Sequence, residues 1–301
     1  MAKVNVLGVP HAYELTAPSP PTEVLVFIHG WLLSRAYWQP LVADLAHQYA
    51  CLTYDLRGFG DSTQAVEQRR QGHCHCSLPS EATRSPYGLA AYAEDLICLL
   101  NQLNIRRAWL LGHSLGGSIA LWAAHLAPQQ ISGVICVNAG GGIYLKEDFD
   151  RFRSAGQQIV RFRPSWLRRL PLLDLVFARA MVDQPLSRIW GQRRLDDLVS
   201  AHPQAAQAAL LESTTEAEVH LLPQIVASLE QPAYFVGGQQ DQVMEPQYVN
   251  HLASFHPLFR TPESNVIELS QCGHMAMLEQ PRALAKVVQE ILAKHTGPSP
   301  G

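Results

Sequence analysis

The residue of this sequence with the clearest chemical potential is Ser114, which lies between two glycines in Gly-His-Ser-Leu-Gly (112–116). An apolar run at 108–111 predicts a buried strand, and the run at 116–127 predicts a helix that ends at Pro128. A turn this tight leaves no room for side chains two residues either side of the serine. The glycines relieve that crowding, so we expect the hydroxyl to be exposed at the top of a sheet, where a nucleophile can act.

A serine hydroxyl is a weak nucleophile near neutral pH and needs a base, which in turn needs a carboxylate to fix its tautomer. Asp241 follows a predicted strand at 233–237, and His274 follows another at 266–269. Side chains beyond the carboxyl ends of parallel strands converge at one edge of the sheet, however far apart they are in sequence. Ser114, Asp241 and His274 are therefore the predicted nucleophile, acid and base; a turn-forming role is the alternative for Asp241.

These residues belong to a pattern that resembles the α/β-hydrolase fold, in the large group of esterases, haloperoxidase-like enzymes and C–C hydrolases. The resemblance extends from residue 23 to 295 and implies a mostly parallel central sheet with helices on both faces and a helical cap insertion. Epoxide hydrolases and haloalkane dehalogenases of this fold use an aspartate nucleophile, so Ser114 argues against both. The segments that carry the resemblance are Val-Leu-Val-Phe-Ile-His-Gly-Trp (24–31), Tyr-Asp-Leu-Arg-Gly-Phe-Gly-Asp-Ser (54–62), the serine pentapeptide, Asp241, Gly-His (273–274) and Glu-Gln-Pro (279–281).

The resemblance also implies an oxyanion hole made from two backbone N–H groups. In the family one donor comes from the loop after the first strong strand, so Trp31 is the expected donor together with Leu115. Leu32 is the alternative, because the path of this loop is not visible in the sequence. His29 is expected to shape the loop rather than act as a base, and the glycine-containing turn at 57–62 is expected to be structural.

Other polar residues near the predicted strands are weaker candidates. Asp148 and Asp150 follow a predicted strand at 134–137, where a minority of the family carries its acid. The residue at the end of that strand is Asn138, which cannot carry the charge. His113 is expected to pack beside the serine.

The length of 301 residues favours one catalytic domain with an insertion over two equal domains. We expect an α/β-hydrolase core at 1–142 and 223–296, a helical cap at 143–222 and a disordered tail at 297–301. The cap is punctuated by prolines at 164, 171, 185 and 203, which predict helices at 147–161, 166–182, 186–200 and 203–212.

The composition limits the classes of function. A hydrophobic content of 47% supports a large core, and a net charge of −3 argues against general binding to nucleic acid. The first residues lack the apolar segment of a signal peptide, no run is long enough to span a bilayer, and the six scattered cysteines are typical of reduced thiols. These features predict a cytoplasmic protein.

Two segments interrupt the alternation of strands and helices. The polar stretch at 64–87 contains His-Cys-His-Cys (73–76), but no second ligand pair has zinc-site spacing, so a surface insertion is favoured and no metal or other cofactor is expected. In the cap, ten arginines stand against two aspartates between 151 and 194, beside an apolar run at 166–177. Such a cap could contact anionic lipid peripherally or admit an acidic, apolar substrate; packing on the core with solvated arginines is the alternative.

The sequence therefore predicts a serine hydrolase that cleaves a carboxylic ester through an acyl-enzyme, acting on an apolar or lipid-like small molecule. One alternative is a C–C bond hydrolase or lyase of the same fold, similar to the menaquinone-pathway synthase. Another is a ligand receptor with slow turnover.

Overall fold

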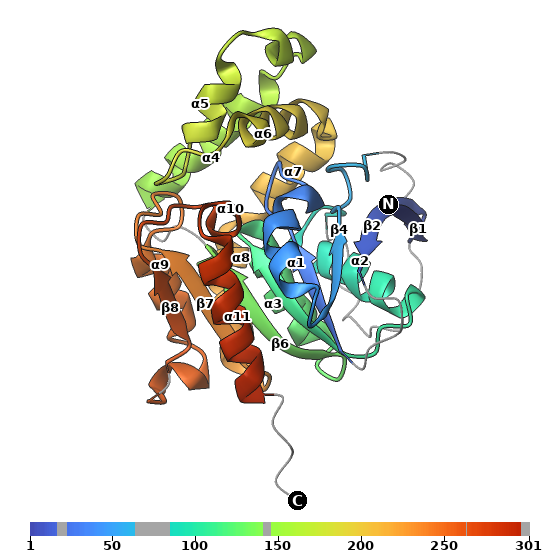
Figure 1. The fold of residues 1–301 in the computed structure, drawn as a ribbon, viewed down its shortest axis with the longest axis vertical. Helices are drawn as coiled ribbons and strands as arrows, with labels where there is room; N and C mark the ends of the chain where they lie inside the picture. Colours follow the sequence, from blue (N-terminus) through green and yellow to red (C-terminus); the bar gives the residue numbers. More distant parts are fainter. Residues whose placement is uncertain (17–22, 64–84, 141–145, 263, 296–301) are drawn as a thin grey trace, which may run out of the picture.

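The computed structural model describes residues 1–16, 23–63, 85–140, 146–262 and 264–295. An eight-stranded sheet forms its centre, in the order β1-β2-β4-β3-β5-β6-β7-β8 (Figure 1). The two edge pairings β1–β2 and β2–β4 are antiparallel and the other five are parallel, as the resemblance implied. The strands are β1 Ala2–Val6, β2 Val9–Leu15, β3 Val24–Ile28, β4 Ala50–Tyr54, β5 Ala108–His113, β6 Ile131–Val137, β7 Ala233–Gly238 and β8 Val266–Leu269.

The central strands are apolar on both faces because helices cover both sides of the sheet. In β3 the side chains alternate between two cores: Val26 and Ile28 belong to one, and Leu25 and Phe27 to the other. This explains why the sequence shows continuous apolar runs at these strands rather than an alternation of polar and apolar residues.

Helices from distant parts of the sequence share each face of the sheet. Apolar residues of α2 (Leu89–Gln102), α3 (Leu115–Leu126), α8 (Glu216–Ser228) and α9 (Pro246–Ala253) contribute to the first core. The second core is formed with α1 (Gln39–Leu45), α10 (Ala276–Glu279) and α11 (Pro281–His295). Short 3-10 helices, η1 (Arg35–Trp38) and η4 (Pro257–Arg260), complete these layers.

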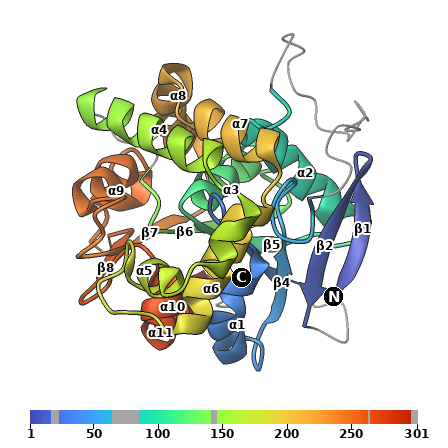
Figure 2. The same cartoon turned by 90° about the horizontal axis from the view of Figure 1, so that it is seen from above.

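The segment between β6 and α8 forms a helical insertion that lies over the carboxyl edge of the sheet (Figures 1 and 2). We use the name helical insertion for residues 146–213. Its elements are α4 Lys146–Arg161, η3 Ser165–Arg169, α5 Leu173–Arg179, α6 Arg188–Ser200 and α7 Pro203–Ser213.

The prediction of one helix at 166–182 is wrong. The structure has the short η3 and α5 there, separated at Pro171 and Leu172. Leu172 adopts the left-handed conformation with φ of 64°, which ends one helical segment before the next begins. The other three predicted helices are confirmed to within two residues, whereas α8 was not predicted at all.

Candidate active site

Ser114 occupies a strained turn between β5 and α3. Its backbone has φ of 51° and ψ of −117°, a conformation that non-glycine residues rarely adopt. A Cβ added at Gly112 would lie 2.2 Å from the carbonyl oxygen of Gly116, and one at Gly116 would lie 2.2 Å from that of Ile28. The prediction that both glycines relieve crowding is therefore confirmed. The strain is concentrated at the predicted nucleophile.

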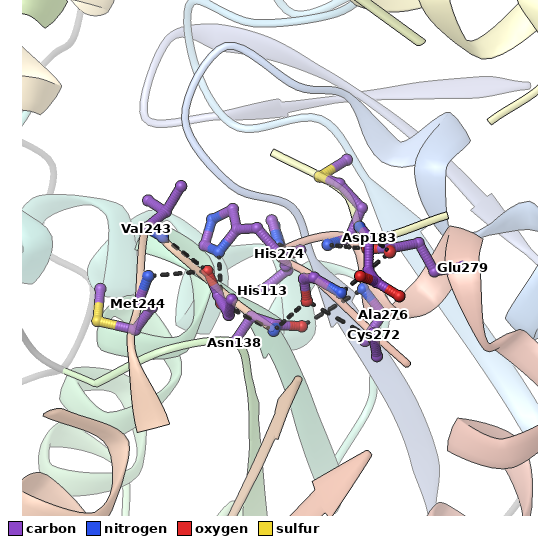
Figure 3. A network of polar contacts seen from close by, with 12 residues as sticks. His113, Asn138, Asp183, Val243, Met244, Cys272, His274, Ala276 and Glu279 are labelled. Atoms are coloured by element: carbon purple, nitrogen blue, oxygen red, sulfur yellow. Dashed lines mark hydrogen bonds and ion pairs between the residues drawn. The ribbon is translucent and has the colours of Figure 1, made fainter. Parts of the chain in front are cut away.

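The predicted acid and base are in direct contact. His274 Nδ1 donates a hydrogen bond of 2.8 Å to Asp241 Oδ2, and both side chains are buried (Figure 3). The other carboxylate oxygen accepts bonds from the backbone N–H groups of Val243 and Met244. Burial alone would raise the pKa of Asp241, but the charge of His274 and these hydrogen bonds outweigh it and hold the pKa below its usual value. Asp241 is therefore ionised and fixes His274 with Nε2 available as a base.

The serine and the histidine face the same cavity. Ser114 and His274 both line a pocket of about 440 Å³, although no hydrogen bond of the Ser114 hydroxyl occurs within the part of the chain that the structure describes. Contacts between a catalytic nucleophile and its base are often loose in the absence of substrate. The structure thus brings the three predicted residues to one edge of the sheet.

His113 packs against the predicted base and cannot compete with it. Its Nε2 donates to the carbonyl oxygen of His274 at 2.7 Å, and the two ring centroids are 4.8 Å apart. Burial, reinforced by the charge of His274, lowers the pKa of His113 to about 3. The ring therefore stays neutral near pH 7 and supports the His274 loop, in agreement with its expected packing role.

Asn138 is a site residue whose role the sequence did not reveal. Its Nδ2 donates 2.9 Å to Asp241 Oδ2 and 3.0 Å to the carbonyl oxygen of Gly273 (Figure 3). Its Oδ1 accepts a longer bond from the N–H of Ala276. A neutral amide at the end of β6 therefore connects the acid to the loop of the base. The sequence feature that could have pointed to Asn138 is its position at the end of a strand, on the same edge of the sheet as Ser114, Asp241 and His274.

Glu279 joins the same loop to the helical insertion. Its Oε2 accepts backbone N–H bonds from Asp183 (2.7 Å), Gln184 (3.2 Å) and Gly273 (3.0 Å), and its Oε1 accepts one from Met275 (3.0 Å). The N–H of His274 itself donates 2.9 Å to the carbonyl oxygen of Met181. The loop that carries the base is thus fastened to the insertion on both sides of the histidine.

One predicted oxyanion donor and its alternative border the same pocket. Trp31 and Leu32 line it, and Leu115 begins α3 directly after the serine. Within the described part of the chain, no backbone acceptor is present for the N–H groups of Trp31, Leu32 or Leu115. The positive end of the α3 dipole adds to the field at this point. Both loop residues thus remain candidate donors, and φ of 56° at Leu32 shows that the loop is strained.

The loop that follows β3 is held in place by His29 and by the ring of Trp31. His29 Nε2 accepts from the N–H of Leu56 at 2.9 Å and its Nδ1 donates to Gly30, so it shapes the loop as expected. Trp31 Nε1 donates 2.7 Å to the carbonyl oxygen of Ala206 in α7. The loop at 29–33, which carries the predicted oxyanion donor Trp31 and is called the oxyanion loop below, is thus also bound to the helical insertion.

The pocket wall is mainly apolar and comes largely from the insertion. Arg194 is the one arginine or lysine among the described residues of the wall. It is buried and donates to the carbonyl oxygens of Phe177 and Ala180 at the end of α5. Burial lowers the pKa of this guanidinium, which nevertheless remains charged. The lining residues include Leu33, Phe152, Ile159, Phe162, Leu167, Leu173, Phe177, Met181, Leu198, Val243 and Met275.

The remaining candidates do not contribute to this site. Asp148 and Asp150 lie within α4 rather than at the end of β6. In the turn at 57–62, Arg57 is buried in an ion pair with Asp95, which agrees with a structural role. The residues at 73–76 and the tail at 297–301 lie outside the described residues.

Comparisons with known proteins identify the family of this chain. The model of the alpha/beta hydrolase fold family matches residues 23–281, and the chain belongs to this family. It is 24% identical over 91% of its length to an uncharacterized hydrolase of Bacillus subtilis (strain 168), of which it also covers 91%. It is 28% identical over 92% of its length to a 2-succinyl-6-hydroxy-2,4-cyclohexadiene-1-carboxylate synthase of an Enterobacter species, of which it covers 94%.

A solved structure of a thermophilic esterase from Thermogutta terrifontis has the same fold, with a TM-score of 0.72 at 21% identity. The match covers 98% of this chain and 99% of the esterase. Together these matches establish the family and the architecture.

Proposed function

We propose that this protein is a serine hydrolase that cleaves carboxylic esters with an apolar acyl group. The observation that carries the proposal is the buried hydrogen bond between Asp241 and His274, with the histidine opening onto the same apolar pocket as the strained Ser114. A base held by an ionised acid beside an exposed serine is the arrangement that acyl transfer requires.

In the proposed reaction, Ser114 Oγ attacks the ester carbonyl carbon while His274 Nε2 accepts its proton. Asp241 stabilises the imidazolium, and the N–H groups of Leu115 and of Trp31 or Leu32 stabilise the oxyanion. His274 then protonates the leaving alkoxide as the carbon–oxygen bond breaks, which leaves an acyl-enzyme. Water activated by His274 hydrolyses this intermediate and restores the serine.

The substrate class follows from the pocket. A volume of about 440 Å³ lies within the range of small-molecule sites, and a wall of leucine, isoleucine and phenylalanine side chains favours a medium or long acyl chain. We propose that the helical insertion (146–213), which makes up most of the predicted cap at 143–222, covers this pocket, since its side chains make up much of the wall.

Replacement of Ser114 by alanine tests the proposal directly. The variant should lose hydrolysis of p-nitrophenyl octanoate by at least about a thousandfold, because the nucleophile is absent, while its thermal unfolding stays unchanged. Wild-type protein should hydrolyse the octanoate with a higher kcat/KM than the acetate. Near-normal turnover by Ser114→Ala would remove the assigned role, and a serine that reacts once with a fluorophosphonate but never turns over esters would indicate a receptor.

A second candidate is a C–C hydrolase or lyase that acts on an acidic substrate. Arg194 favours it, because a buried cation on the pocket wall, in no ion pair with a described carboxylate, suits a substrate carboxylate. The similarity to the carboxylate synthase of Enterobacter points in the same direction. A clear preference for the methyl ester of a dicarboxylic acid over a neutral ester of equal length, lost in Arg194→Gln, would support this candidate over the first.

A further inference from the structure

We propose that the helical insertion carries a docking surface for an anionic membrane. Of the eleven large hydrophobic side chains exposed among the described residues, eight fall between residues 159 and 189. The segment between α4 and α5, yellow-green in Figure 1, forms the end of the molecule opposite the C terminus. We call these eight side chains the insertion face: Ile159, Phe162, Trp166, Leu170, Leu172, Val176, Met181 and Ile189.

The positive charges around the insertion face indicate that its partner is anionic. Ten arginines against two aspartates between 151 and 194 give a surplus of eight positive charges in a chain whose net charge is −3. Exposed apolar side chains flanked by arginines match a bilayer surface, where the apolar groups enter the acyl boundary and guanidinium groups contact lipid phosphates. The exposed arginines between 151 and 194 are Arg151, Arg161, Arg168, Arg169, Arg179, Arg188 and Arg193.

Two residues of the insertion face combine an exposed apolar side chain with a strained backbone. Leu172 has φ of 64° and is 61% exposed, and Met181 has φ of 59° and is 48% exposed. In water, glycine or asparagine at these turns would remove both the strain and the apolar exposure. An apolar partner that covers Leu172 and the exposed part of Met181, which also lines the pocket, would offset this cost.

The position of the pocket favours a membrane over a second copy of the chain. Ile159, Phe162 and Met181 belong both to the insertion face and to the pocket wall. A bilayer on this face would supply acyl chains to the pocket, whereas a second protein copy would cover its rim. The link to substrate entry rests on the proposed esterase function, but docking itself does not.

Sedimentation with vesicles tests docking without reference to catalysis. Wild-type protein should bind vesicles of phosphatidylcholine containing about one third phosphatidylglycerol, bind pure phosphatidylcholine weakly, and dissociate from the anionic vesicles in high salt. The double variant Trp166→Ser, Leu172→Asn should bind at least about tenfold more weakly, since it removes two apolar anchors that do not line the active-site pocket. Leu172→Asn also relieves the strained backbone, so its thermal unfolding midpoint should not fall.

Matched control variants distinguish binding through the insertion face from binding driven by positive charge or exposed apolar side chains elsewhere on the molecule. Arg161→Glu with Arg169→Glu should abolish binding, whereas Arg106→Glu with Arg107→Glu should not. Phe255→Ser, which removes an exposed aromatic far from the insertion in sequence, should also bind normally. No binding to anionic vesicles, or equal binding by all variants, would overturn the proposal. So would a dimer in analytical ultracentrifugation that the Trp166 and Leu172 changes dissociate, because the partner would then be a second copy.

Discussion

Asn138 illustrates how a neutral side chain can position Asp241 and the loop of His274 relative to each other. It donates to the same oxygen of Asp241 that accepts the hydrogen bond from His274, and to the backbone of the loop that carries the histidine. A second carboxylate in its place would repel Asp241, whereas the amide supplies a donor without charge.

Asn138→Ala should therefore lower kcat for ester hydrolysis by roughly tenfold to a hundredfold. A hydrogen bond to a charged group contributes about 1.5 to 3 kcal/mol, and its loss allows Asp241 and the His274 loop to shift. Steady-state kinetics on a p-nitrophenyl ester would measure the effect. Asn250→Ala, which removes an amide that bonds only Pro246 among the described residues, is the control and should retain normal kcat. Equal activity of the two variants would contradict the positioning role of Asn138.

The sequence identified some of these residues and not others for a physical reason. Ser114 is marked by local crowding, which requires glycines at fixed spacing, and His274 and Asp241 are marked by strand ends. The role of Asn138 depends on contacts with residues more than a hundred positions away. That of Glu279 depends on contacts 95 and 96 positions away and on the His274 loop. Such contacts leave no pattern in the local sequence.

At the scale of elements, Glu279 joins the helical insertion and the His274 loop into one hydrogen-bonded unit. A glutamine at 279 keeps the shape but offers one acceptor oxygen, and its NH2 group opposes at least one backbone N–H. Glu279→Gln should therefore lower kcat/KM by about tenfold or more and reduce the thermal unfolding midpoint by a few degrees.

The exposed Glu290 provides the comparison for this effect. Glu290→Gln removes the same charge from α11, where the carboxylate pairs only with Lys286 at 3.8 Å among the described residues, and should change neither quantity. If Glu279→Gln also left both unchanged, the insertion and the His274 loop would not be coupled through this carboxylate.

Most strands were predictable because buried parallel strands require continuous apolar runs with polar ends. The helices of the insertion were harder to predict from the sequence. The apolar run at 166–177 suggested one helix, but Pro171 and the left-handed Leu172 divide it. Helix α8 escaped prediction although Thr215 caps it by accepting from the N–H of Glu218, because Pro223 lies inside it.

At the scale of the whole molecule, Asp197 connects the insertion to the core in a pH-dependent way. It lies in α6 and accepts a hydrogen bond from Ser34, which follows the oxyanion loop. Burial raises the pKa of Asp197 to about 7, against the opposing effects of Ser34 and Arg193. The folded protein therefore binds a proton that the unfolded chain releases near pH 4.

Since the folded state holds the extra proton, the free energy of unfolding should fall as pH rises from about 4 to about 7. The loss from this group is at most about 4 kcal/mol, because each pKa unit corresponds to about 1.4 kcal/mol. Asp197→Asn should flatten that slope in urea unfolding measured across this range. The neighbouring Asp196→Asn is the control and should keep the wild-type slope. A slope that Asp197→Asn leaves unaltered would refute the assignment.

The overall arrangement followed from the family resemblance, but the pocket did not. Its wall combines residues from the oxyanion loop, four elements of the insertion and the two loops of the acid and base. Side-chain packing between segments so far apart decides which acyl group fits. No helix in the described part of the chain has the length and apolar character to cross a membrane.

The most direct test of the central claim is the mass of the intact protein after reaction with a fluorophosphonate, followed by peptide mapping. The account predicts a single adduct on Ser114, formed at least about a hundredfold more slowly in His274→Ala, because the serine would lack its base. Equal labelling rates in the wild type and His274→Ala, or an adduct on another residue, would contradict it.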